Sequence, residues 1–304
     1  MKRLSRKKRK LVQFYLFISP WIIGFLFFTV VPMLTSLYYS FTKITILGLG
    51  RRKPEFIGID NFVRALTDDE VFMQSIGNTF FYSIVRVLLG LFVALLIALL
   101  LDRKILGKKV FRTLVYIPAI VPIVANAFLW KQLFSQDFSL FNYFIVNLGM
   151  APVEWLNYDN AMWSVILMSI WSGIGPSMLI LLAALQGVPK DLVEASEIDG
   201  ANALHKFRYI VVPMISSTLL YLVVTGFIGT LQAFAEMDLL TAGGPGTSTT
   251  TMAMNVIQNA FSSDGSGMGY ASAQAWIIFV IILIFTIIFF KIISKHVYYA
   301  GGDE

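Results

Sequence analysis

The sequence contains no cysteine, only two histidines and few charged residues. The absence of cysteine excludes disulfides, thiolate catalysis and thiolate-ligated metal ions. His205 and His296 lie far apart in the chain, so they do not predict a metal site either. Charged residues make up 14% of the 304 positions, whereas a soluble domain has about 25%. Together with a hydrophobic content of 57%, this shortage of charge indicates a protein that lies in a lipid bilayer.

The sequence also lacks a phosphate-binding loop of the type G-x-x-x-x-G-K-[ST]. The chain is therefore not expected to bind or hydrolyse ATP itself. No clustered histidines and no nucleophile–base set are evident, which disfavours a membrane enzyme. The net charge of +6 does not indicate nucleic-acid binding, because the basic residues gather beside apolar segments, as they do in membrane proteins. We expect no catalytic residues, no cofactor or metal bound by this chain, and no nucleic-acid partner.

Six long apolar segments follow one another along the chain. A helix needs about 20 residues to cross a bilayer. The predicted spans are roughly residues 11–41, 79–101, 113–134, 162–185, 214–234 and 275–293. The sequence therefore predicts an all-α integral membrane protein with six transmembrane helices, in which residues 1–10 form a basic tail and residues 11–304 one membrane domain.

Some residues within and between these spans modify that picture. Prolines inside the first and third spans predict kinks or breaks; they are Pro20, Pro32, Pro118 and Pro122. Arg86 lies near the predicted start of the second span, where a long side chain can reach the membrane interface. Between the first two spans, residues 42–78 predict a short amphipathic surface helix around Phe62, although an ordinary linker is the alternative.

The distribution of lysine and arginine predicts the orientation. The tail, residues 102–112, residues 187–212 and the segment from 291 onward together hold seventeen of these residues, whereas the alternate loops hold six. Positive residues remain in the cytoplasm. Both termini and the 187–212 segment are therefore expected to be cytoplasmic, and an even number of spans agrees with this.

The most informative polar stretch lies between the fourth and fifth spans, with the sequence VPKDLVEASEIDGANALHKFRYIVVP over residues 188–213. Asp191 is placed to cap a helix over Leu192–Ile198. Gly200 permits a positive φ and therefore a sharp reversal before a second helical run. The spacing predicts a helix–turn–helix with a small tip at Asp199–Ala201. A solvated loop that merely joins two spans fits the spacing equally well.

Within this stretch, EASEIDGA resembles the EAA loop of the membrane subunits of binding-protein-dependent ABC importers. Further segments, spread over nearly the whole chain, are similar to the permeases of carbohydrate systems of the maltose and glycerol-phosphate type. They are FIGIDNF (56–62), Asn78–Thr79, FRTLVYIP (111–118), WLNYDNA (155–161), LTAGGPGTST (240–249) and GYASA (269–273). Ser196 stands where the family usually has alanine, and serine is small enough to keep the packing.

The resemblance implies a type I ABC importer-like permease subunit, a multi-pass protein of the cytoplasmic (inner) membrane of a prokaryote. It also implies a sugar substrate, expected to be an oligosaccharide, and several partners: a second homologous permease subunit, two ATPase subunits, an external solute-binding protein and membrane lipid. ATP and Mg²⁺ would be bound by the ATPase. The loop 187–213 would seat its short coupling helix in the ATPase. The coupling residues implied are Glu194, Ala195, Ser196, Asp199, Gly200, Ala201 and Pro213.

Polar and aromatic residues inside the spans are candidates for the substrate path, because such residues are costly in lipid and usually face the interior of a bundle. A sugar needs amides and carboxylates for its hydroxyls and flat rings for its C–H faces. The candidates are Asn126, Trp130, Trp171, Ser172, Gln232 and Glu236. The alternative is that the tryptophans anchor the membrane interface and the serine packs between helices.

The external segment Gly243–Gly244–Pro245 predicts tight turns. It is a candidate for the outer gate or for the contact with the binding protein, and a simple connector is the alternative. A different class of function is a stand-alone secondary transporter or channel for small polar solutes. The spans lack the paired intramembrane Asp, Glu or Lys and the internal repeats that such carriers often have. The sequence does not identify the sugar.

Overall fold

The computed structural model describes residues 6–45, 53–103, 105–135, 139–262 and 267–293. Residues 1–5 of the predicted tail, and the C-terminal residues 294–304 with His296, lie outside this description. Contacts group the chain into two compact units, one of residues 1–69 and 256–277 and one of residues 70–255 and 278–304. The prediction of a single domain over residues 11–304 stays a prediction, and each unit is described by itself.

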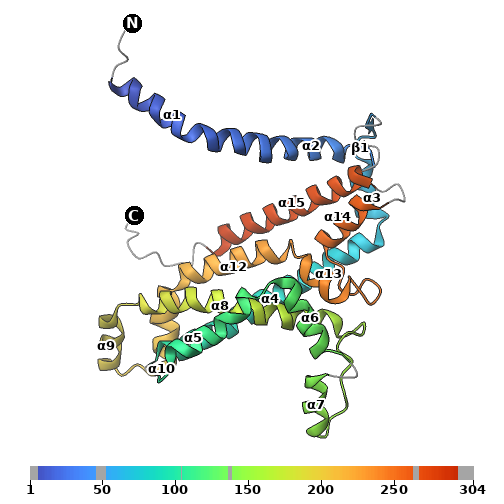
Figure 1. Ribbon diagram of the computed structural model, residues 1–304. Helices are drawn as coiled ribbons and strands as arrows, with labels where there is room; N and C mark the ends of the chain where they lie inside the picture. The colour runs from blue at the N-terminus through green and yellow to red at the C-terminus, as the bar shows by residue number, and fades with distance from the viewer. Residues whose placement is uncertain (1–5, 46–52, 104, 136–138, 263–266, 294–304) are drawn as a thin grey trace. The chain divides into compact units, whose positions relative to one another are not determined.

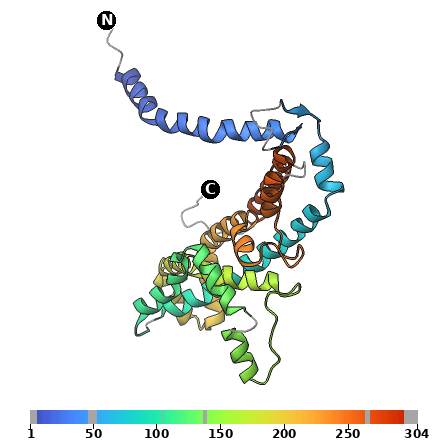
Figure 2. The ribbon, with the colours of Figure 1, turned by 45° about the vertical axis from the view of Figure 1, so that its right-hand side comes forward.

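The first unit begins with a curved helical run (Figure 2). It consists of α1 (Arg6–Phe25), a π-helical turn η1 (Leu26–Val30) and α2 (Val31–Ser40). Pro32 has no N–H to donate into the preceding turn, and the wider π-turn lies directly before it. The most apolar part of the run, within Lys10–Ser40, has no buried residue. These side chains are therefore available to lipid or to another chain.

Two of the recognised segments hold the rest of the first unit together. The unit contains strands β1 (Thr42–Lys43) and β2 (Glu55–Phe56), helix α3 (Asp60–Thr67) and parts of α14 (Met252–Phe261) and α15 (Gly267–Ile293). Asn61 of FIGIDNF donates its Nδ2 to the carbonyls of Ser40 (2.9 Å) and Thr42 (3.0 Å). Gly269 of GYASA lies so close to Thr42 that a Cβ there would overlap its carbonyl oxygen. Both segments therefore pack against the same turn of backbone.

The core of the second unit is formed by three helices, α4 (Glu70–Asp102), α8 (Ala161–Gln186) and α12 (Ser216–Thr230). Ala94 and Ala98 on α4 are fully buried beside Leu181 and Leu182 on α8. Small residues one helical turn apart let two helices approach closely in the absence of a hydrophobic driving force between them. Figure 1 shows these helices running side by side.

The third predicted span is broken, as its prolines indicate. Helix α5 (Lys108–Tyr116) continues into a short 3₁₀ turn, η3 (Ile117–Ile120), and α6 (Ile123–Leu133) then departs at a bend of 100°. Pro118 lies at the start of the 3₁₀ turn and Pro122 immediately precedes α6. The remaining short helices of the unit are α7 (Leu140–Asn147) and α13 (Ala235–Thr241), and α13 packs on α6.

Four helical segments in the described residues are long and apolar enough to cross a membrane, and six if each of two bent pairs is one span. The bent pairs are residues 108–133 and 203–230. Two helices extend further outward than predicted: α4 begins at Glu70 rather than at residue 79, and α15 begins at Gly267 rather than at residue 275. Hydropathy marks only the apolar part of a helix, whereas its hydrogen bonds continue through polar residues. The count of exactly six spans stays a prediction.

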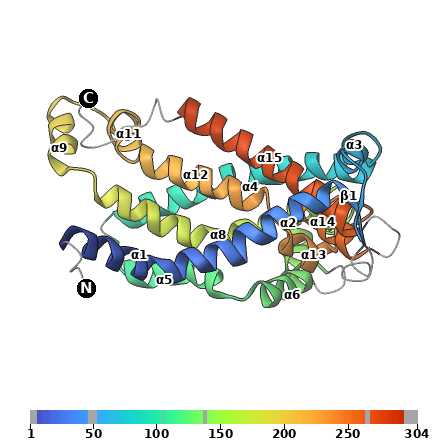
Figure 3. The same cartoon turned by 90° about the horizontal axis from the view of Figure 1, so that it is seen from above.

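The predicted helix around Phe62 is present as α3, which ends at Thr67 and is separated from α4 by Asp68 and Asp69. Its position on the membrane surface stays a prediction. Within the second unit, α9 (Lys190–Ile198) and α10 (Ala203–Lys206) lie at one end, beyond the carboxyl end of α8. Helices α6 and α13 lie at the opposite end of that unit, as Figure 3 also shows. The loop 187–213 thus lies beyond the carboxyl end of α8, whereas Trp171 and Ser172 lie near the middle of this helix.

Candidate functional site

The first helix of the loop 187–213 begins two residues earlier than predicted, at Lys190 rather than at Leu192. Helix α9 begins at Lys190, and its N-cap residue is Pro189, with φ −59° and ψ 127°. The prediction that Asp191 caps the helix is wrong, because the extended Pro189 already ends the preceding segment. Asp191 lies instead in the first turn of α9. At this position its negative carboxylate stabilises the helix by interacting with the positive end of the helix dipole.

Helix α9 ends in a Schellman motif. The Ala201 N–H donates to the Ser196 carbonyl (2.9 Å) and the Gly200 N–H to the Glu197 carbonyl (3.1 Å). Gly200 has φ +79°, which confirms the predicted positive dihedral. A left-handed residue at this position satisfies the last carbonyls of the helix, and glycine adopts it without a steric penalty.

The second arm of the loop is helical, as predicted, and begins at Ala203 rather than at Ala201. Asn202 caps α10 by accepting a hydrogen bond from the His205 N–H (2.9 Å). Beyond Lys206 the chain forms a π-turn, η4 (Phe207–Val211), and then α11 (Val212–Met214), which contains Pro213. The second helical run predicted over residues 201–209 is therefore present over Ala203–Met214, with a π-turn before Pro213, as before Pro32.

The loop is ordered by its own contacts, and its apolar side chains remain uncovered. Lys206 Nζ lies 2.7 Å from Glu197 Oε1 and so joins the two arms. The Ser196 hydroxyl donates to the Val193 carbonyl (2.6 Å), so the serine that replaces the usual alanine adds no unsatisfied polar atom. Ile198 is 88% exposed and Leu204 is 71% exposed. Exposed apolar side chains on an ordered element indicate a surface that another protein covers.

At the other end of the unit, three of the six substrate-path candidates lie together. Asn126 and Trp130 are buried one turn apart on α6. The Trp130 ring meets Trp171 of α8 edge to face, with ring centroids 5.7 Å apart. Among the described residues, Asn126 Oδ1 and Trp130 Nε1 have no hydrogen-bond partner. Each such buried atom costs about 1–3 kcal/mol, so a ligand or a rearrangement of the helices would relieve it.

The other three candidates are placed differently. Ser172 donates to the carbonyls of Met168 and Ser169 in its own helix. Gln232 is exposed and donates its Nε2 to the Ile228 carbonyl (2.9 Å). Glu236 is half-buried in the first turn of α13. The structure therefore brings Asn126, Trp130 and Trp171 into one cluster and leaves the polar groups of Ser172 and Gln232 turned to their own helices.

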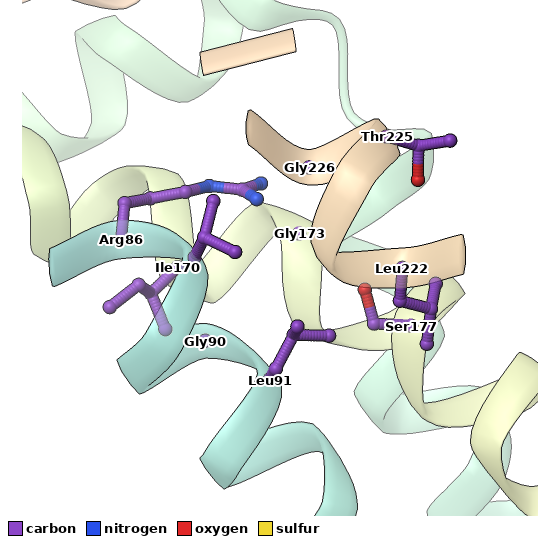
Figure 4. A pocket seen from close by; sticks show the side chains of 10 residues that line it. Arg86, Gly90, Leu91, Ile170, Gly173, Ser177, Leu222, Thr225 and Gly226 are labelled. Carbon is purple, nitrogen blue, oxygen red and sulfur yellow. The ribbon is translucent and has the colours of Figure 1, made fainter. Parts of the chain in front are cut away.

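The sequence analysis missed a cavity that contains Arg86. Arg86 is the central residue of the 33-residue helix α4, and its side chain extends towards α8 and α12 (Figure 4). Its Nε donates to Ser169 Oγ (3.2 Å), and this Oγ lies 2.7 Å from the Tyr82 hydroxyl. The cavity has a volume of about 190 Å³, and Gly90, Ile170, Gly173 and Gly226 line it with Arg86.

The prediction that Arg86 reaches the membrane interface is therefore wrong. Its side chain is half-buried and lies against α8. The error arose because the start of the helix was placed at residue 79, which put Arg86 near an end. One signal was available: Arg86 is the only charged residue between Glu70 and Asp102.

The Gly243–Pro245 segment forms the predicted tight turn and is attached to α4. Gly243 is buried with φ +84°, and a Cβ there would lie 2.8 Å from Thr250 Oγ1. The peptide bond between Gly244 and Pro245 is cis. Asn78 of α4 donates its Nδ2 to the carbonyls of Thr247 (2.8 Å) and Thr250 (2.9 Å). Two further segments that resemble the family, Asn78–Thr79 and residues 240–249, are thus joined by hydrogen bonds. The role of the turn in the outer gate or in the contact with the binding protein stays a prediction.

A metal centre finds no support in the part of the chain that the structure describes. No group of three or more histidine, aspartate or glutamate side chains there could hold a metal ion. The chemistry that the described residues offer is that of hydrogen bonding, aromatic stacking and the half-buried guanidinium of Arg86.

Comparison with known proteins assigns the fold and the family. Residues 86–298 match the model of the binding-protein-dependent transport system inner membrane component. The chain belongs to this family. The matched residues include the loop 187–213 and the cavity at Arg86, so both lie within the part that the family shares. The resemblance inferred from the EAA-like loop is confirmed.

The similarity to curated relatives extends over nearly the whole chain. A probable ABC transporter permease protein, YesP of Bacillus subtilis, is 38% identical and covers 95% of this chain and 93% of its own. The sn-glycerol-3-phosphate transport system permease protein UgpA of Yersinia enterocolitica is 32% identical, covering 94% and 95%. The trehalose/maltose transport system permease protein MalF of Thermococcus litoralis is also 32% identical, covering 91% and 92%.

A solved structure has the same fold as the permease. It is a chain of a bacterial ABC transporter involved in the import of the acidic polysaccharide alginate. The match has a TM-score of 0.80 and covers 97% of this chain and 99% of the other, at 24% identity. The fold prediction of a helical importer permease is thereby confirmed at the level of architecture.

Proposed function

We propose that this permease is a membrane-spanning subunit of an ATP-driven, binding-protein-dependent importer of a sugar, expected to be an oligosaccharide. Membership of the family carries the proposal. Relatives named for sn-glycerol-3-phosphate and for trehalose and maltose support a small, hydroxyl-rich substrate. The shared fold with a permease chain of an alginate importer agrees with this substrate class. The chain forms half of the translocation pathway, and a second homologous permease subunit forms the other half.

The proposed topology has six spans, with each bent helix pair crossing once and both termini in the cytoplasm of a prokaryote. The excess of lysine and arginine in the loops on that side supports the orientation. Loop 187–213 is then cytoplasmic, whereas the Gly243–Pro245 turn and α6 lie towards the outer face. An external solute-binding protein delivers the sugar to that face, where Gly243, Gly244 and Pro245 contribute to the outer gate or to the binding-protein contact.

The loop 187–213 couples the permease to a pair of ATPase subunits, which bind ATP and Mg²⁺. This coupling role is supported by the hydrogen bonds that order the loop and by the exposed apolar side chains of α9 and α10. Helix α9 is the docking element, and the turn at Gly200 permits its tip to enter a groove on the ATPase. The residues proposed for coupling are Glu194, Ala195, Ser196, Asp199, Gly200, Ala201 and Pro213. ATP-driven closure of the ATPase pair moves α8 and α12 through this loop.

The sugar path runs along the inner faces of α4, α6, α8 and α12. The unsatisfied polar atoms of Asn126 and Trp130 support contact with a sugar hydroxyl, and Trp171 supplies a flat ring beside them. Glu236 remains a candidate acceptor. Ser172 and Gln232 are weaker candidates for contact with the sugar, because the Ser172 hydroxyl and the Gln232 Nε2 already donate to backbone carbonyls four residues earlier in the chain.

Co-purification in mild detergent tests this proposal. We expect the tagged permease to bring a second permease subunit and an ATPase with it, and the isolated complex to hydrolyse ATP faster when the loaded binding protein is added. A chain that purifies alone and still transports solutes would contradict the proposal and would favour a stand-alone secondary transporter or channel.

A further inference from the structure

The guanidinium of Arg86 is a cation inside the helical unit without an acidic partner. It lies in the middle of α4, and about 24 Å of helix separates it from each end at 1.5 Å per residue. This distance exceeds the reach of an arginine side chain. Charged groups within spanning helices are costly and usually pair with an opposite charge or line a path for a charged solute.

Among the described residues, no ion pair is formed by Arg86. The ion pair between Lys206 and Glu197 lies in the loop at the end of the unit and does not involve Arg86. Arg86 is held only by Ser169, whose hydroxyl is shared with Tyr82. Glu236 interacts electrostatically with Tyr82, as Arg86 does, but it forms no ion pair with Arg86. In the described residues no hydrogen bond or ion pair engages the outer nitrogens of the guanidinium, and the side chain lines the cavity.

The cavity around Arg86 is open and its walls suit a sugar. Gly173 allows the guanidinium to lie against α8, because a Cβ at this position would overlap Arg86 Nη2. Ser177 and Thr225 bring hydroxyl groups to the lining, and Leu91 and Leu222 bring apolar surface. A volume of about 190 Å³ is many times the roughly 10–15 Å³ that one ordered water needs, so the cavity has room for more than a single water molecule.

We propose that Arg86 binds the anionic substituent of the transported sugar, so that the substrates are acidic saccharides. The inference rests on the proposed importer function and narrows its substrate class. A guanidinium binds a carboxylate or a phosphate through two parallel N–H···O hydrogen bonds. A neutral sugar would leave the cation unpaired within the path. Arg86 thus selects for charge, whereas Asn126, Trp130 and Trp171 contact hydroxyls and C–H faces common to all sugars.

Uptake into proteoliposomes by the complete importer, with its own binding protein, separates these cases. The substrates are three kinds of saccharide, namely short oligogalacturonates, their methyl esters and neutral oligogalactosides, together with glycerol 3-phosphate. The ester keeps the sugar backbone and loses only the charge. We expect uptake of a carboxylate or a phosphate substrate, according to which anion is native. For a carboxylate, the wild type should transport the acid about 10- to 100-fold faster than its ester, as expected for loss of a charged hydrogen bond.

Variants assign the selectivity to Arg86. Arg86→Gln should abolish the preference for the anion, and Arg86→Lys should retain most of it. Gly173→Ala should reduce the preference as well, because the added methyl group displaces the guanidinium. Lys131→Gln is the matched control, since it removes one positive charge at an exposed position on α6 outside the cavity. Its preference should equal that of the wild type.

The outcomes separate the two proposals. A wild-type importer that takes up the ester or neutral oligogalactosides, and neither anion, overturns the acidic-substrate inference and leaves the importer function intact. An unchanged preference in Arg86→Gln also overturns it. If no saccharide of the three kinds enters in an ATP-dependent manner, the proposed sugar import itself is contradicted. The preference of the wild type is measured independently of whether any variant assembles.

Discussion

At the scale of the residue, the segments that reveal the family mainly hold the protein together. Asn61 binds the backbone of β1, and Asn78 binds the backbone after the Gly243–Pro245 turn. Asparagine is suited to this role because its amide donates to two carbonyls at once. The sequence indicated that these residues matter without indicating why, since their partners lie 19 and 169 positions away.

Gly175 allows α5 and α8 to approach each other, and this yields a prediction. A Cβ at Gly175 would lie 2.8 Å from Tyr116 Cα and 2.8 Å from the Val115 carbonyl oxygen. Because both are backbone atoms, Gly175→Ala should force the helices apart and destabilise the fold by about 1–3 kcal/mol. A lower midpoint of thermal unfolding in detergent measures this effect.

Gly90→Ala is the matched control for that measurement. A Cβ at Gly90 meets only Ile170 Cγ1, at an ordinary distance of 3.8 Å. The midpoint of this variant should stay close to that of the wild type. Equal midpoints for Gly175→Ala and Gly90→Ala would show that the close approach of α5 and α8 is not required.

At the scale of the element, the sequence predicted where a helix is broken better than where a helix begins. The bend between α5 and α6 followed from Pro118 and Pro122, because proline removes a backbone donor wherever it occurs. The start of α4 was missed by nine residues, since polar residues such as Gln74 and Asn78 are as compatible with a helix as with a loop. The misplaced Asp191 cap has a similar origin, because Pro189 competed with it as the last residue before the helix.

The exposed tip of α9 leads to a prediction about assembly. Ile198 is 88% exposed, and burying an isoleucine side chain contributes about 1.5–3 kcal/mol. Ile198→Ser should therefore weaken the binding of the ATPase by about 10- to 100-fold. Retention of the ATPase during affinity purification at increasing dilution measures this loss.

Leu148→Ser provides the comparison for Ile198→Ser, because Leu148 is 74% exposed at the end of α7, on the side assigned to the outer face. It should leave ATPase retention unchanged. If the two serine variants behave alike, α9 does not dock on the ATPase. The Lys206–Glu197 pair is partly exposed, so removing it should contribute less than about 1 kcal/mol.

At the scale of the whole molecule, the absence of cysteine makes the orientation measurable. A single cysteine introduced at Asn202 should react with a membrane-impermeant maleimide only after the cell membrane is opened, because the proposed topology places the loop 187–213 in the cytoplasm. A single cysteine at Leu148 should react in intact cells. Both positions are exposed, so accessibility within the protein does not limit either reaction. The reverse labelling pattern would contradict the charge-based topology.

The candidate site was only partly accessible from sequence, for a reason that belongs to this scale. The loop 187–213 is local, so its helix and its glycine turn could be inferred from 27 consecutive residues. The cluster of Asn126, Trp130 and Trp171 was inferred by residue type, and three other residues chosen in the same way lie elsewhere. The cavity at Arg86 is formed by residues of α4, α8 and α12 together. A sequence pattern does not show that residues so far apart in the chain lie side by side.

The central claim is that movement of the ATPase reaches the spans through the turn at Gly200. Gly149 offers an unusually close control. It also has φ +79°, has open space around it, and follows α7 in the same hydrogen-bonding pattern, with the Met150 N–H donating to the Ile145 carbonyl (3.2 Å). Valine at either position is strained by about 1–2 kcal/mol. Only at Gly200 should this strain and added bulk interrupt coupling.

ATP-driven sugar uptake by the reconstituted importer, compared between Gly200→Val and Gly149→Val, tests this claim most directly. The account predicts that Gly200→Val loses uptake and its accompanying ATP hydrolysis although the permease still inserts into the membrane, whereas Gly149→Val transports at close to the wild-type rate. Normal uptake by Gly200→Val, or an equal loss in both variants, would contradict it.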